Sequence, residues 1–315
     1  MFERVAFVWG ENVSGSGPLT SSPSVSVALW PEVLGCASLR WTDGNMPDIS
    51  GYDVFLVNLF HTPDSTHIAQ IRKARPDAVI VAMPDPSLDL VLMHPEWMPM
   101  LEQMALADWI GGRTVYDCEV YATLLNKPST WLPSPIGPTE WYEPYRELAK
   151  EDYIVALDHP MEPYASAHNV AALAAIQRET GLRVLYASAH DATKQYAQLS
   201  GLKAEWFDWV SFGDFVGMTA RAKLSVDLYA RHSYHRHAVM CAMVGTPCVA
   251  SRWSSVALGS TSVTSPFCTD DAVLTAMNLL HDHHYDREGG FALVEQEFGF
   301  EASRQRIAFL LETVR

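Results

Sequence analysis

The feature that most constrains this chain is an alternation of short, apolar segments with helix-like segments, which runs twice along the sequence. The apolar segments include residues 4–10, 53–60 and 78–83 in the first half, and residues 153–157 and 183–187 in the second. A strand that is apolar at nearly every position is buried on both faces, and such strands alternating with helices are typical of a parallel sheet with crossover helices. The sequence therefore predicts an α/β protein.

A proline-rich segment separates the two series. Pro133 to Pro144 contains four prolines and Gly137, a composition typical of a linker. We therefore expect two Rossmann-like domains, residues 1–135 and residues 136–315, with a last helix that can pack back on the first domain. Further strands are expected at 37–41, 107–111, 129–132, 204–209, 223–228 and 247–251, and helices at 25–34, 65–74, 93–104, 115–125, 167–180, 194–199, 212–221, 237–244, 270–284 and 301–314.

The composition indicates a folded chain without a membrane span. The sequence has 315 residues, of which 48% are hydrophobic, and this is enough to bury a sizeable core. It contains no stretch near the roughly 18 apolar residues that a membrane span needs, and its first residues show no signal-peptide pattern. Its five cysteines form no Cys-x-x-Cys pair, which favours reduced thiols. We therefore expect a cytoplasmic protein with no integral membrane contact.

The charge distribution is uneven. The net charge of −15 disfavours tight, sequence-independent binding to nucleic acid, because phosphates are repelled at long range. Within this acidic chain, residues 221–252 carry five Lys and Arg side chains against one Asp, a net charge of +4. This basic stretch is either a site for an anionic ligand or a solvated helix end.

Three stretches carry a resemblance to a known family. Residues 132–138 read LPSPIGP, residues 209–227 contain a helix and an apolar strand ending at Asp227, and residues 236–251 read RHAVMCAMVGTPCVAS. They are similar to the joint between lobes, to a helix and strand of the second lobe, and to the helix–Gly–Thr–Pro–strand signature of GT-B glycosyltransferases. The chain most resembles the retaining, family 4-like group, which includes bacterial and phage enzymes.

The resemblance implies a GT-B fold, in which two Rossmann-like domains face each other across a cleft. It implies a glycosyltransferase that moves a hexosyl or pentosyl group from a nucleotide sugar, foremost a UDP-sugar, to an acceptor hydroxyl with no bound metal or other cofactor. Side chains and helix dipoles must then stabilise the departing diphosphate, and Arg236 is the first candidate because a guanidinium binds two phosphate oxygens at once. The donor-binding candidates are Arg231, His232, Tyr234, His235, Arg236, Gly245 and Thr246.

Two departures from the family pattern bear on activity. The family carries a glutamate that contacts the donor ribose where this chain has Met240, and His232 stands at the other acidic or polar position, two helical turns upstream. The family also carries an Arg and a Lys after the first strand of the second lobe, and residues 158–163 contain neither. The phosphate-binding role is therefore assigned to Arg231 and Arg236, helped by backbone N–H groups where the following helix begins.

Candidate residues on the acceptor side follow strands of the first domain. His61 follows the strand at 53–60, and Asp85 follows the strand at 78–83. Either would be the general base in an inverting reaction, whereas His61 would contact the sugar in a retaining one. A loop after the first strand is rich in small residues, which let a backbone approach a ligand closely. The resemblance implies that this loop contacts the acceptor or a phosphate, and its candidates are Glu11, Asn12, Ser14, Gly15 and Gly17. A surface loop and structural side chains are the alternative interpretation.

Histidines and cysteines do not form a metal-binding pattern. The spacing of the histidines at 232, 235, 237, 281, 283 and 284 matches no zinc site, and no cysteine pair accompanies them. We therefore expect no metal. Cys241 and Cys248 flank Gly245 and are expected to be small core residues rather than a redox pair.

Several functions stay open. A glycosyltransferase could act on a glycan, a lipid-linked or a small-molecule acceptor, or on a 5-hydroxymethylpyrimidine in phage DNA, in which case the protein would work in the host cytoplasm. A nucleotide-sugar epimerase has the same two lobes, and the methionine at position 240 raises the alternative of a module that binds a nucleotide or sugar without turnover. The stereochemistry and the oligomeric state are open as well.

Overall fold

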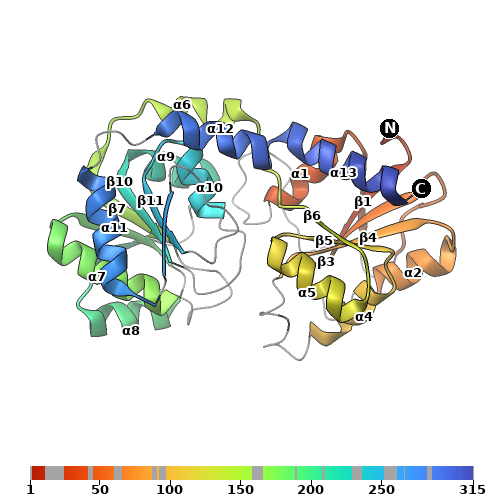
Figure 1. Ribbon diagram of the computed structural model, residues 1–315, viewed down its shortest axis with the longest axis horizontal. Helices are drawn as coiled ribbons and strands as arrows, with labels where there is room; N and C mark the ends of the chain where they lie inside the picture. The colour runs from red at the N-terminus through yellow and green to blue at the C-terminus, as the bar shows by residue number, and fades with distance from the viewer. Residues whose placement is uncertain are drawn as a thin grey trace. The chain divides into compact units, whose positions relative to one another are not determined.

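The computed structural model describes residues 2–10, 25–41, 45–59, 66–86, 91, 97–157, 166–188, 190–207, 210–228, 236–251, 261–265, 267–281 and 286–314. These residues form two six-stranded sheets in which all the strand pairs are parallel (Figure 1). The chain divides into two compact units, unit 1 with residues 1–137 and 298–315 and unit 2 with residues 138–297. The α/β class predicted from the sequence is confirmed.

Unit 1 is a sheet in the order β2-β1-β3-β4-β5-β6. Its strands are β1 (Val5–Gly10), β2 (Ala37–Trp41), β3 (Val54–Leu59), β4 (Val79–Pro84), β5 (Trp109–Gly112) and β6 (Ser129–Trp131). Its helices are α1 (Val25–Leu34), α2 (His67–Ala74), α4 (Met98–Ala105), α5 (Val115–Leu125) and α13 (Phe300–Val314). The chain thus leaves this unit inside the proline-rich segment and returns to it for its last helix.

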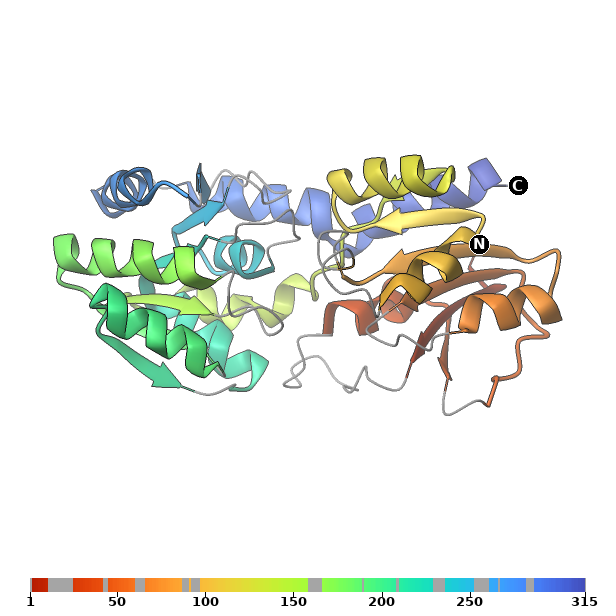
Figure 2. The same ribbon diagram turned by 90° about the horizontal axis from the view of Figure 1, so that it is seen from below.

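Helices cover both faces of the unit 1 sheet (Figure 2). On one face, α2, α4 and α5 pack side chains such as Ile68, Met104 and Tyr121 against buried residues of β3 and β4. On the other, α1 contacts β1 and α13 packs against both α1 and β6. Every residue of β3 is buried, as expected for a central strand covered on both faces.

Unit 2 is a second sheet, in the order β12-β11-β10-β7-β8-β9. Its strands are β7 (Glu151–Leu157), β8 (Arg183–Ala187), β9 (Ala204–Phe207), β10 (Ala222–Asp227), β11 (Cys248–Ser251) and β12 (Thr261–Thr264). Its helices are α6 (Glu143–Arg146), α7 (Ser166–Thr180), α8 (Asp191–Ser200), α9 (Phe212–Arg221), α10 (Arg236–Met243), α11 (Thr269–His281) and α12 (Arg287–Phe298), with a 3-10 turn at Thr139–Trp141.

The helices of unit 2 also divide between the two faces of its sheet. Helix α7 packs against α8 and α11, and together they cover a core that includes Leu173, Tyr186 and Leu224. Helices α9 and α10 pack against each other and against β10 on the opposite face, where α10 brings Cys241 onto Cys248 of β11. Both sheets therefore have their helices arranged as in a Rossmann-like domain.

Candidate functional site

The carboxyl edge of the unit 2 sheet is a candidate binding site, because ligands of open parallel sheets bind at the carboxyl ends of the strands. Strand β10 ends at Asp227, and α10 begins at Arg236 on the far side of a connection that lies outside the described residues. Arg236 is half-buried and occupies the first position of its helix, and the amino ends of helices favour anions. A basic side chain and a helix amino end thus coincide at this edge. The other predicted residues of the connection, Arg231, His232, Tyr234 and His235, lie outside the described residues.

A buried hydrogen-bond chain fixes α10 to the sheet beneath Arg236. The hydroxyl of Ser225 on β10 donates to the carbonyl oxygen of Val155 on β7 at 3.1 Å. Its single proton is used there, so the Nε2–H of His237 is the donor in the 2.8 Å bond between His237 and Ser225 Oγ. His237 is 5% exposed and its ring also meets the edge of Phe215. The network orients the first turn of α10, which Arg236 begins.

Asn169 is a second residue that shapes this edge, and the sequence analysis did not identify it. It lies in the first turn of α7 and is 5% exposed. Its Oδ1 accepts a bond of 3.2 Å from the backbone N–H of Leu228, directly after β10, and its Nδ2 lies 3.4 Å from the hydroxyl of Tyr186 near the end of β8. Asn169 therefore fixes the point from which the chain leaves β10 toward Arg236.

Gly245 and Thr246 lie at the other edge of the sheet. Gly245 ends α10 with φ of 68°, and Thr246 precedes β11. Thr246 is fully buried: its hydroxyl donates to the carbonyl oxygen of Thr219 at 2.7 Å and accepts from the ammonium of Lys150 at 2.7 Å. These bonds are internal and stand at the amino ends of the strands, whereas Arg236 stands at the carboxyl side of β10.

In unit 1, an ion pair occupies the carboxyl edge. Asp85 directly follows β4, and its backbone N–H donates to the carbonyl oxygen of Leu59 at the end of β3 at 2.9 Å. Its carboxylate forms an ion pair with Arg113, which directly follows β5, and both side chains are less than a fifth exposed. Asp85 was predicted from its place after a strand, and Arg113 was not.

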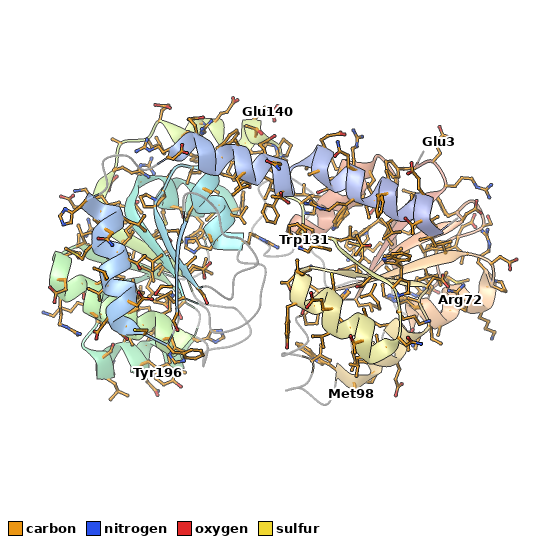
Figure 3. The ribbon with its side chains drawn as sticks, viewed as in Figure 1. Glu3, Arg72, Met98, Trp131, Glu140 and Tyr196 are labelled. Atoms are coloured by element: carbon orange, nitrogen blue, oxygen red, sulfur yellow. The ribbon has the colours of Figure 1, made fainter. Side chains whose placement is uncertain are left out.

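Close packing explains where Arg113 stands. A Cβ atom at Gly112 would lie 2.6 Å from Cys118 Sγ and 2.9 Å from the backbone nitrogen of Cys118, so only glycine fits where β5 turns into α5. The carbonyl oxygen of Arg113 accepts a bond of 3.0 Å from the indole of Trp131. Trp131, labelled in Figure 3, in turn carries the guanidinium of Arg306 4.5 Å from its ring centre.

His67 marks a further polar position at this edge that the sequence analysis missed. It begins α2, stacks on Trp41 at the end of β2 with ring centres 4.5 Å apart, and would lie 3.7 Å from a Cβ at Gly10, the end of β1. Burial lowers the pKa of His67 to about 4, and its Nδ1 has no hydrogen-bond partner among the described residues. The ring is therefore neutral at pH 7. The predicted residues His61, Glu11, Asn12, Ser14, Gly15 and Gly17 lie outside the described residues.

Other features bear on cofactors and anchoring. No group of three potential metal ligands occurs within the described ranges, and no helix there is long and apolar enough to cross a membrane. All five cysteines are free thiols, and Cys241 and Cys248 pack with Ala238 and Ala250 in a buried cluster.

Comparisons with known proteins identify the fold. No family model matches the sequence, and no curated protein sequence matches it.

Solved structures match over almost the whole chain. The trehalose-6-phosphate structure from E. coli with bound UDP-2-fluoro glucose has 10% identity and a TM-score of 0.73, with 98% of this chain and 99% of that chain covered. HepE from Anabaena, in complex with UDP and glucose, has 12% identity and a TM-score of 0.70 with the same coverage. A UDP-forming trehalose-phosphate synthase from Burkholderia xenovorans has 12% identity and a TM-score of 0.67, with 98% of each chain covered. The fold is that of the GT-B glycosyltransferases, with two Rossmann-like domains.

Proposed function

We propose that this protein is a glycosyltransferase that transfers a sugar from a UDP-sugar to an acceptor hydroxyl. The observation that carries the proposal is the shared GT-B fold: the match extends over 98% of this chain to structures that contain UDP-2-fluoro glucose or UDP and glucose. In this proposal, unit 2 is the donor domain and unit 1 is the acceptor domain.

In this proposal the diphosphate binds near Arg236 in unit 2. Arg236 at the start of α10 combines a guanidinium with backbone N–H groups of a helix amino end, and both stabilise phosphate oxygens. The bonds from His237 to Ser225 and from Leu228 to Asn169 hold this helix and strand in register before a donor arrives. Preorganised donors of this kind stabilise a charge that grows in the transition state without reorganising.

Unit 1 supplies the group proposed to meet the acceptor. When the acceptor oxygen bonds to the anomeric carbon, the bond from that carbon to the diphosphate oxygen breaks and its electron pair leaves with the diphosphate. The acceptor proton must go to a base, either Asp85 or, with retention, an oxygen of the leaving diphosphate. The guanidinium of Arg113 fixes one side of the Asp85 carboxylate and so orients the rest of it.

A small acceptor fits this proposal better than DNA. The net charge of −15 opposes a polyanion, whereas it does not repel a neutral sugar hydroxyl. A 5-hydroxymethylpyrimidine in DNA gains no support from the structures compared above, whose names refer to trehalose-6-phosphate, trehalose-phosphate synthase, UDP and glucose. We therefore propose a sugar or another small molecule as acceptor.

A second candidate function is nucleotide or sugar binding without turnover. Met240 stands where the family has its ribose-binding carboxylate, and the side chain is 4% exposed in the middle of α10. A packed methionine offers no hydrogen bond to a ribose hydroxyl, so donor affinity must come from the phosphates and the base.

The test is release of UDP from a panel of UDP-sugars, with glucose and glucose 6-phosphate as acceptors. Turnover of one donor is the expected result, with Arg236→Gln weakening the donor at least about tenfold, since charge-assisted hydrogen bonds contribute about 1.5–3 kcal/mol. Arg178→Gln is the matched control. It removes the same charge from a different place, the last turn of α7. Thermal stabilisation by UDP without turnover would favour the binding module, and no response to any nucleotide would overturn both.

A further inference from the structure

In unit 2, α6 and α12 lie near each other (Figure 1), and the carboxyl ends of α9 and α10 reach the same end of the sheet, whereas Arg236, the first residue of α10, stands at the opposite end. The amino end of β7 and the turn between α10 and β11 lie at the end that the carboxyl ends of α9 and α10 reach, and α6 packs against α9. Arg146 of α6 reaches α12, where it pairs with Glu288 at 2.9 Å and lies 4.1 Å from the ring centre of Phe291. The proposed donor and acceptor sites make no use of this end.

Lys150 is a half-buried cation of this region. It directly precedes β7, and its ammonium donates to the carbonyl oxygen of Ala220 and to Thr246 Oγ1, both at 2.7 Å. An ammonium has three protons, and within the described part of the chain the third has no acceptor. Burial, and then the charge of Arg287, lower the pKa of Lys150 to about 8, and Cys241 opposes this shift by raising the pKa.

Arg287 is a second cation beside it. The Arg287 side chain packs against the backbone of Gly245. A Cβ atom added at Gly245 would lie 3.1 Å from Arg287 Cδ and 3.6 Å from Arg287 Nε. Gly245 adjoins Thr246, so the guanidinium and the ammonium flank the same turn. Arg287 forms no hydrogen bond or ion pair with another described residue, and Glu288, its neighbour, is taken by Arg146.

Two cations close to one turn repel each other, which raises the free energy of the folded protein. An anion bound between them would offset this repulsion. The acidic side chains that adjoin the two cations in sequence, Asp286 and Glu151, have other partners. Asp286 accepts from the N–H of Gly289 at the start of α12, and Glu151 lies 3.7 Å from Arg221. The arrangement offers one ammonium proton and a whole guanidinium fork to an oxyanion, whose several oxygens can accept from both.

We propose that Lys150, Arg287 and the Gly245–Thr246 turn form an anion site for a phosphate group, separate from the proposed donor site. The ligand is inorganic phosphate or the phosphate of a small ester, bound by the guanidinium of Arg287 and the ammonium of Lys150. Because Lys150 also holds Ala220 and Thr246, an anion here tightens the junction of α9, the α10–β11 turn and α12.

The experiment measures phosphate binding by calorimetry and by thermal unfolding, at constant ionic strength maintained with chloride. The probes are inorganic phosphate and glycerol 3-phosphate, each tested on wild type, Arg287→Gln, Arg178→Gln and Arg236→Gln. Arg287 is exposed and forms no hydrogen bond or ion pair with another described residue, so we expect the fold to survive its replacement, which the unfolding curve without phosphate checks, and Arg178→Gln controls for the loss of one positive charge. We expect phosphate to raise the unfolding temperature of wild type and of both other variants, and Arg287→Gln to weaken binding about tenfold or more.

The Arg236→Gln variant separates this site from the proposed donor site. A phosphate response that survives in Arg236→Gln and is lost in Arg287→Gln belongs to the Lys150 site, whether or not UDP-sugar is turned over. A response to glycerol 3-phosphate alone would identify a phosphate ester as the ligand. Binding should also weaken as the pH rises through about 8, where the Lys150 ammonium loses its proton. Equal responses in Arg287→Gln and Arg178→Gln, or no response beyond that to chloride, would overturn the proposal.

Discussion

At the scale of single residues, the rule that functional residues follow strands predicted Asp85 but not its ion-pair partner, Arg113. Asp85 could be found because a carboxylate directly after a buried strand is easy to read in a sequence. Arg113 could not, because its pairing with Asp85 depends on which two strands are neighbours, and nothing in a single sequence gives that order. His67 escaped notice for a similar reason: its contact with Trp41 joins the start of α2 to the end of a strand 26 positions earlier.

Asp85→Asn tests the proposed catalytic role directly. The change keeps the shape of the side chain but removes its charge and its ability to take a proton, so kcat should fall about 100-fold or more if Asp85 is the base. The donor KM should stay within about twofold, because Asp85 lies in unit 1. Steady-state UDP release measures both constants. Asp77→Asn, on the exposed turn before β4, should behave like wild type. An Asp85→Asn enzyme with full kcat would remove Asp85 from the mechanism.

His67 should make the protein sensitive to acid. Its pKa is about 4 in the folded state and near 6.5 in the unfolded chain, so unfolding takes up a proton between these values. The free energy of unfolding should therefore fall as the pH drops from about 6.5 to 4, and the fall should be smaller in His67→Phe, which keeps the stacking on Trp41. Urea unfolding across this range measures it. His281→Phe, at the exposed end of α11, should retain the wild-type slope, and a His67→Phe slope equal to wild type would contradict the assignment.

At the scale of elements, most of the strands and helices expected from the sequence form within a few residues of the expected bounds. Apolar runs such as 54–59 favour a strand over a helix, because they are short, rich in β-branched and aromatic residues and bounded by turn residues. Strand β12 was missed because Thr261–Thr264 is short and mostly polar. Helix α12 was missed because two adjacent glycines, Gly289 and Gly290, disfavour a helix; the carboxylate of Asp286 caps this first turn by accepting from the N–H of Gly289 at 2.8 Å.

The cap of α5 supports the position of Arg113 and can be tested as an element. Thr114 Oγ1 accepts from the N–H of Asp117 at 2.9 Å and donates to its carboxylate at 2.7 Å, and both residues are buried. Thr114→Ala removes both bonds, and we expect a loss of about 1–2 kcal/mol in the free energy of unfolding. Thr123→Ala, later in the same helix, removes one exposed bond to the carbonyl of Glu119 and should cost less than about 0.5 kcal/mol. Equal losses in the two variants would show that the cap contributes little.

At the scale of the whole molecule, charge bears on the acceptor. A net charge of −15 makes association with a polyanion unfavourable at physiological salt. We expect duplex DNA, with or without hydroxymethylated pyrimidines, neither to accept sugar nor to inhibit transfer to a small acceptor. Scintillation counting of labelled sugar in precipitated DNA would check this. Label in hydroxymethylated but not in unmodified DNA would establish the DNA acceptor instead.

The last helix has a consequence for how the polypeptide becomes a protein. Helix α13 contributes Ile307, Leu310 and Leu311 to unit 1 and packs on α1, which ends 266 positions before α13 begins (300 − 34). During synthesis, all of unit 2 is translated before α13. Until α13 is translated, the face of unit 1 that α13 covers stays uncovered. The amino-terminal unit of this polypeptide is therefore the last to be finished, because α13 is translated after all of unit 2.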